Sequence, residues 1–128
     1  MVLRSLGLGI LLRWMLGLAS CQETPQLNNF DSAQWKKDKF ACAGLRQALL
    51  PQFEKNREKL MGLGQNQILT LLGKPDFAEL YQRGQRYYFY YYKKSNVCQG
   101  EKPDPLAGPW IRVRFDALDR VSEIIINP

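Results

Sequence analysis

The sequence contains no histidine among its 128 residues. Histidine is the commonest general base near neutral pH and a frequent metal ligand, so its absence excludes Ser-His and Cys-His nucleophile pairs. Serine is sparse as well. After residue 20 the serines are Ser32, Ser95 and Ser122, and none lies in the Gly-x-Ser-x-Gly context of a serine hydrolase. We therefore expect no catalytic residue, no bound metal and no cofactor.

The chain also lacks a phosphate-binding loop and a concentrated basic tract. Gly62-Leu63-Gly64 has neither the lysine nor the spacing of such a loop and better fits the end of one helix and the start of another. The net charge of +6 is mild, and the basic residues between 36 and 59 alternate with acids as on a solvated helix face. This charge favours anionic headgroups or an acidic protein partner, and no nucleic acid is expected.

What the chain does contain is a short apolar segment ending in Leu-Ala-Ser-Cys at residues 18–21. An aliphatic residue, two small residues and a cysteine form a bacterial lipobox, and Arg4 supplies the positive start of a signal peptide. The alternative, a buried or membrane-spanning helix, is disfavoured because the segment is short and interrupted by Arg13. We predict that residues 1–20 are a lipoprotein signal peptide and that Cys21 carries the lipid.

The residues after Cys21 predict location and organisation. Gln22 follows the cysteine, and enteric sorting retains lipoproteins at the inner membrane when Asp stands there, so we expect the periplasmic face of the outer membrane. Residues 21–31 are polar, include Pro25 and read as a tether. Residues 32–128 are then a single domain.

Cys42 and Cys98 remain after lipidation. Two cysteines left in a small domain of an oxidising compartment usually pair. The bridge would close a loop of about 57 residues and stabilise the fold by about 4 kcal/mol at most. The alternative is a buried free thiol at Cys42 and an unrelated Cys98.

Helical periodicity covers residues 32–72. An apolar stripe at Trp35, Cys42, Leu45 and Leu49 predicts a helix over about 32–50. Pro51 then either kinks this helix or begins a second helix that runs to about residue 61.

A short third helix is predicted between Gly64, its N-cap, and Gly73, its stop. Ile68, Leu71 and Leu72 lie at positions i, i+3 and i+4 and should all face inward.

From residue 76 the apolar period becomes two. Segments 77–82 and 85–94 flank an Arg83-Gly84 hairpin turn, and segments 111–115 and 121–126 alternate in the same way. The second segment is aromatic on both faces and should be a central strand. We therefore expect an α+β fold in which two to three N-terminal helices pack on one face of a three- to four-stranded antiparallel sheet.

Strand parity predicts a binding face. Ile111, Val113 and Phe115 should face the helices, which turns the alternating arginines outward. Phe89 has no polar group and should face the core, so the tyrosines of opposite parity should lie outside. The predicted outer face consists of Arg86, Tyr88, Tyr90, Tyr92, Arg112 and Arg114. Tyrosine beside arginine is typical of protein interfaces, although an ordinary solvated sheet face would explain it equally.

The helix–strand junction and the end of the chain carry a family pattern. The matching residues are Gly62-Leu63-Gly64-x-x-x-Ile68-x-x-Leu71-Leu72-Gly73-x-Pro75 and Phe115-Asp116-x-x-x-Arg120-Val121. Over residues 60–126 this resembles the SmpA/OmlA family of small outer-membrane lipoproteins, which includes BamE of the β-barrel assembly machine. The resemblance implies two helices on a three-stranded antiparallel sheet, as also in β-lactamase-inhibitor proteins, and a lipid anchor.

Together these features predict a non-catalytic, lipid-anchored interaction module whose protein partner is unidentified. An accessory role in outer-membrane β-barrel assembly is the favoured interpretation. The alternative is an inhibitor or ligand-sequestering lipoprotein that binds a soluble protein through its sheet face, and an enzyme is the least favoured.

Overall fold

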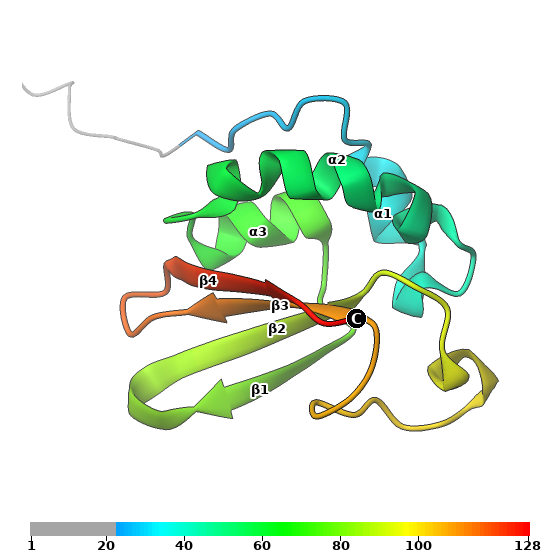
Figure 1. Cartoon of the computed structure of the whole chain (residues 1–128). Coiled ribbons are helices and arrows are strands. Elements are labelled where there is room, and N and C mark those ends of the chain that lie inside the picture. The colour runs from blue at the N-terminus through cyan, green and yellow to red at the C-terminus, as the bar shows by residue number, and fades with distance from the viewer. Residues whose placement is uncertain (1–22) are drawn as a thin grey trace, which may run out of the picture.

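The computed structural model describes residues 23–128. Its helices are α1 (Ser32–Lys37), α2 (Leu45–Leu60) and α3 (Gln65–Leu72), followed by strands β1 (Phe77–Tyr81), β2 (Gln85–Tyr91), β3 (Trp110–Phe115) and β4 (Val121–Ile126). The strands form an antiparallel sheet in the order β1-β2-β3-β4, so β2 is an inner strand as predicted. The helices cover one face of this sheet (Figure 1). The predicted α+β fold is confirmed, while the signal peptide and Cys21 lie outside the described residues.

The main core lies between the helices and β3. Ile111, Val113 and Phe115 are fully buried and face the helices, as their alternation predicted. The helix layer meets them with aromatic and aliphatic side chains, and the Trp35 and Phe53 rings stack with centroids 5.5 Å apart. A strand that alternates apolar and basic residues thus separates a packed face from a polar one.

The short helix α3 forms as the sequence predicts. The Gln67 side chain folds back so that its Oε1 accepts a hydrogen bond from the Gly64 backbone N at 2.9 Å. Ile68 and Leu72 are fully buried. Gly73 ends the helix with φ +78°, and a Cβ there would lie 2.7 Å from Lys36 Cγ, so both conformation and space require glycine.

The predicted helix over residues 32–50 is wrong, because the chain breaks between α1 and α2. A 3₁₀ turn, η1 (Lys39–Ala41), and Gly44 at φ +79° interrupt the helix. The buried Asp38 carboxylate directs this break by accepting hydrogen bonds from the backbone N of Ala43 at 2.7 Å and of Arg46 at 3.0 Å. A carboxylate that satisfies free N–H groups at a helix start competes effectively with helix continuation. Pro51 lies inside α2, which continues through it.

The Cys42–Cys98 disulfide is confirmed, with the Cα atoms 5.7 Å apart. Cys42 lies in the break before α2, and Cys98 lies in the 3₁₀ turn η3 (Asn96–Gln99) of the long loop between β2 and β3. The bridge therefore joins two irregular segments. A third short turn, η2 (Gln82–Gly84), makes the predicted β1–β2 hairpin, in which Arg83 and Gly84 both have positive φ.

The predicted tether is docked over the part that the structure describes. The Asn56 side chain clamps the backbone of Asn28, accepting from its N at 2.8 Å and donating to its O at 2.9 Å. Leu27 and Phe30 pack against the main core. Asn56 lies on the buried side of α2, so its amide finds its partners in this segment rather than in water.

A buried ion pair joins the helix layer to the sheet. Arg46 Nη1 lies 2.7 Å from Asp76 Oδ2, and the two side chains are 1% and 0% exposed. Arg46 also donates to the backbone O of Trp35 and of Tyr91 at 2.9 and 3.0 Å. Asp76 accepts from the backbone N of Phe40 and of Tyr91 at 3.1 and 2.7 Å. Because both charges are paired and hydrogen-bonded, their burial is tolerated.

Arg46→Met should therefore destabilise the domain by about 3–5 kcal/mol, since it leaves the Asp76 carboxylate buried without its counter-charge. Urea unfolding measures the effect. The matched control is Arg57→Met on the exposed side of α2, which should change the unfolding free energy by about 0.5 kcal/mol or less. Equal, small effects of the two substitutions would contradict the structural role of the pair.

Candidate interaction surface

The predicted outer face contains the wrong tyrosines. Strand register pairs Tyr88 with Val113 and Tyr90 with Ile111, on the side covered by the helices. Tyr90 is fully buried and Tyr92 is 8% exposed. Arg86 shares this side of β2 and is exposed beside α3, where its Nη1 lies 3.4 Å from the Gln65 side-chain oxygen.

The reason for this error is that tyrosine hydroxyls find partners inside the molecule. The Tyr90 hydroxyl donates to the backbone O of Gly73 at 2.7 Å, and the Tyr92 hydroxyl donates to that of Asn127 at 2.8 Å. The Tyr88 hydroxyl reaches the Gln65 side-chain oxygen at 2.8 Å. A tyrosine with a partner for its hydroxyl packs as a large apolar side chain, so the polar atom did not force these rings outward.

Arg112 and Arg114 do lie on the helix-free side, as predicted, opposite Phe89 and Tyr87 in the register. We call this side of the sheet the open face. Its aromatic and charged members are Phe77, Glu79, Tyr81, Tyr87, Phe89, Tyr91, Trp110, Arg112, Arg114 and Glu123.

One end of the open face is a second, closed core. Phe89 stacks on Phe77 with centroids 4.2 Å apart and meets the edge of Trp110 at 5.0 Å. Ala41 and Val97, which flank the disulfide, pack into this cluster. Phe89 is 1% exposed. The sheet is thus buried on both faces here, which explains why an apolar residue without a polar group faces away from the helices.

The other end of the open face remains accessible and carries the arginines. The Arg112 guanidinium lies 4.5 Å from the centre of the Tyr87 ring, and its Nη2 lies 3.2 Å from a Glu123 oxygen. The Arg112 and Arg114 side chains are 24% and 34% exposed. Arg112 Nε is buried and has no hydrogen-bond partner among residues 23–128. Tyr81, which is 48% exposed, packs on Tyr87 at 5.2 Å.

Sequence parity therefore identified the arginines and missed Tyr81 and Tyr87. The signal that could have found them is in the sequence: Phe77, Phe89 and Trp110 share one parity across the hairpin register, and two cysteine-bearing loops are available to cover them. Because each face of this sheet packs against a core, alternation along a strand does not tell which side faces solvent.

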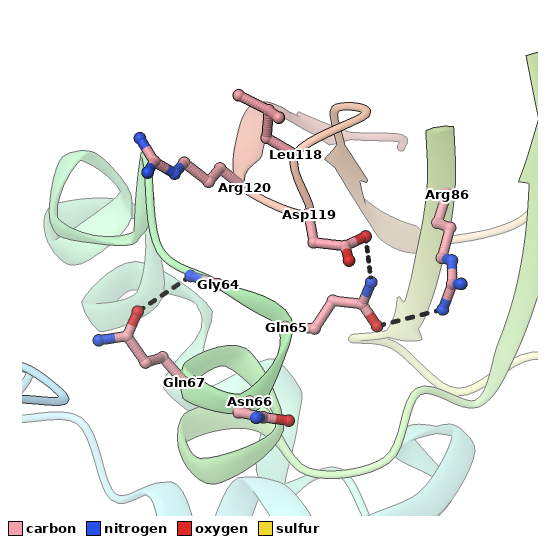
Figure 2. A pocket seen from close by; sticks show the side chains of 8 residues that line it. All are labelled: Gly64, Gln65, Asn66, Gln67, Arg86, Leu118, Asp119 and Arg120. Atoms are coloured by element: carbon pink, nitrogen blue, oxygen red, sulfur yellow. Dashed lines mark hydrogen bonds between the residues drawn. The ribbon is translucent and has the colours of Figure 1, made fainter. Parts of the chain in front are cut away.

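An open hollow of about 510 Å³ lies where the start of α3 faces the β3–β4 turn (Figure 2). Gln65 spans it: its Nε2 donates to Asp119 at 2.7 Å, while its Oε1 faces Arg86. Leu118 and Arg120 form the rim of the turn (Figure 2). Within residues 23–128 no three Cys, Asp or Glu side chains lie close enough to hold a metal.

Comparison of the chain with protein-family models, curated proteins and solved structures gives no match. None of the helices described between residues 23 and 128 has the length and apolarity to cross a membrane.

Burial raises the pKa of the Tyr90 phenol far above its ordinary range, and the neighbouring Tyr88 adds to this while Arg46 opposes it. Burial also raises the pKa of Tyr91 and of Tyr92. A phenol whose pKa is higher in the folded state stabilises the fold below its unfolded pKa of about 10, and this contribution is lost as pH rises above that value.

We therefore expect the unfolding free energy to fall steeply above about pH 10, measured by urea unfolding at a series of pH values. Tyr90→Phe should make this decline shallower, at the cost of about 1 kcal/mol near neutral pH for the lost hydrogen bond. The exposed Tyr81→Phe is the control and should retain the steep decline. A decline that is the same in the Tyr90 variant would contradict this explanation.

Proposed function

We propose that this protein is a non-catalytic, lipid-anchored interaction module on the periplasmic side of the outer membrane, and that it binds a protein partner through the accessible end of the open face. The observation that carries this proposal is the cluster of Tyr87, Arg112 and Arg114. Two arginines held beside an aromatic ring on an exposed sheet present the residue types that dominate protein interfaces.

The geometry of Arg112 supports the proposal. Stacking on Tyr87 and pairing with Glu123 fix its guanidinium before any partner arrives, which lowers the entropy lost on binding. Arg112 Nε is buried without an acceptor in the described part of the chain, and such atoms are rare in folded proteins. A partner's carboxylate or carbonyl oxygen would bond the exposed part of the Arg112 guanidinium and would not reach the buried Nε.

The lipid anchor and the association with barrel assembly rest on the sequence. The lipobox ending at Cys21 supports the anchor, and the resemblance to the SmpA/OmlA family over residues 60–126 supports an accessory role in β-barrel protein assembly. The domain has one helix and one strand more than this resemblance implies, and it shares the arrangement of helices on one face of an antiparallel sheet (Figure 1).

Cys21→Ala tests the anchor. The variant should accumulate as an unprocessed precursor that incorporates no labelled fatty acid, because the sulfur that accepts the lipid is gone. Metabolic labelling and membrane fractionation provide the measurement, with the wild-type chain as reference. Normal maturation of the variant would refute the lipoprotein assignment.

Tyr87→Ala combined with Arg112→Ala tests the open face. Loss of an aromatic and an arginine hot spot should cost about 2 kcal/mol or more in binding, a roughly 30-fold loss of affinity. The measurement compares thermal midpoint with the recovery of barrel-assembly subunits after extraction in mild detergent. Arg57→Ala, on the exposed side of α2, removes the same single positive charge and is the control.

Undiminished recovery with the open-face variant, when its thermal midpoint stays near wild type, would exclude this face as the binding site. Recovery of a soluble enzyme in place of assembly subunits would favour an inhibitor or ligand-sequestering lipoprotein instead.

A further inference from the structure

One end of the domain gathers exposed apolar side chains. The end of α2, the β1–β2 turn and the β3–β4 turn lie on the same side of the molecule (Figure 1), and the backbone of residues 62–64 bonds to the start of β4. These segments expose Leu80 by 81%, Leu118 by 76% and Met61 by 42%. We call this region the turn end, comprising Met61, Leu80, Arg83, Leu118 and Arg120.

The N-terminal chain reaches the domain at the same end. The Gln67 side chain, in the first turns of α3, donates to the backbone O of Glu23 at 3.2 Å. Five residues further on, the Asn56 clamp holds Asn28 against α2. Glu23 is therefore held beside the hollow between α3 and the β3–β4 turn. Residues 23–30 lie against the domain and do not act as a flexible linker.

The remaining distance to the expected lipid is short. Only Gln22 separates Glu23 from Cys21, and two fully extended residues span at most about 7 Å. The headgroup layer on each side of a bilayer is about 5–8 Å thick. A lipid on Cys21 would therefore hold the turn end at the headgroup layer and prevent the domain from standing away from the membrane.

The charges of the turn end suit a lipid surface. Arg83 and Arg120 are exposed and form no ion pair within residues 23–128. The acidic residues of the same turn are engaged internally: Asp119 accepts from Gln65, and Asp116 accepts from the backbone N of Leu118 and of Arg120. Exposed arginines without an ion pair beside exposed leucines are typical of interfacial membrane contacts, although exposed Glu58 and Glu79 at the same end oppose attraction to an anionic surface.

We propose that the turn end is the membrane-facing surface of the domain, with Leu118 and Met61 entering the boundary between headgroups and acyl chains. This inference rests on the lipid anchor of the proposed function. The strand axes then point away from the membrane plane, because the turn end lies at one end of the sheet (Figure 1). The open face consequently looks along the membrane surface and stays accessible to a neighbour held in the same membrane.

The test uses the protein as it matures in bacterial cells, reconstituted with vesicles of phosphatidylcholine and phosphatidylglycerol. Leu118→Cys and, separately, Leu106→Cys are labelled with an environment-sensitive fluorophore while the Cys42–Cys98 disulfide is intact. Leu106 is 91% exposed and lies in the loop between β2 and β3, which leaves the sheet at its other end. The label at position 118 should shift to the blue and lose intensity when spin-labelled lipid is included, and the label at position 106 should do neither.

Vesicle flotation separates the two proposals. If the protein floats with the vesicles and neither label is quenched, or both are quenched equally, the membrane-facing assignment is wrong and the anchor stands. If the protein does not float, the lipid anchor fails and the orientation fails with it.

Discussion

The fold depends on the buried pair of Arg46 and Asp76, because each side chain holds backbone from both layers. Arg46 lies in the first turn of α2 and donates to the carbonyl of Tyr91 in the sheet. Asp76 precedes β1 and accepts from the backbone N of Phe40, between α1 and α2. Two full charges removed from water are stable only with this complete set of partners. The pair thereby fixes how α1, α2 and β2 meet, and the positions of both cores follow from that arrangement.

The sequence predicted those helices and strands that are determined by residues close together in the chain. Helix α3 follows from three inward aliphatic residues between two glycines, and β3 follows from strict alternation around Arg112 and Arg114. The break between α1 and α2 was not predictable in this way, because the helical stripe runs through it. Asp38 ends the helix by satisfying N–H groups at the start of the next one, and a carboxylate with that role resembles any surface aspartate in the sequence.

Of the accessible residues of the open face, the sequence predicted Arg112 and Arg114 and missed Tyr81 and Tyr87. Parity assigns residues to two sides of a strand but does not say which side is buried, and the apolar side chain of Phe89 does not decide it. Here the Cys42–Cys98 bridge brings two loops over the second side, so an apolar ring is buried there as well. The cost of burying a charge explains why Arg112 and Arg114 lie on the open side. Arg86 is exposed on the helix side and tyrosine packs well on either side, so neither residue type identifies the open side by itself.

The Asn56 clamp on Asn28 also determines how the domain responds to mechanical force. A pull applied to the N-terminus reaches the Gln67 contact first and the pair of Asn56 hydrogen bonds next, before any strand of the sheet is loaded. Opening of those bonds would release the backbone only as far as Leu27, which packs with Phe30 against the main core. The docked segment therefore takes up tension before the sheet, the Arg46–Asp76 pair and the disulfide do.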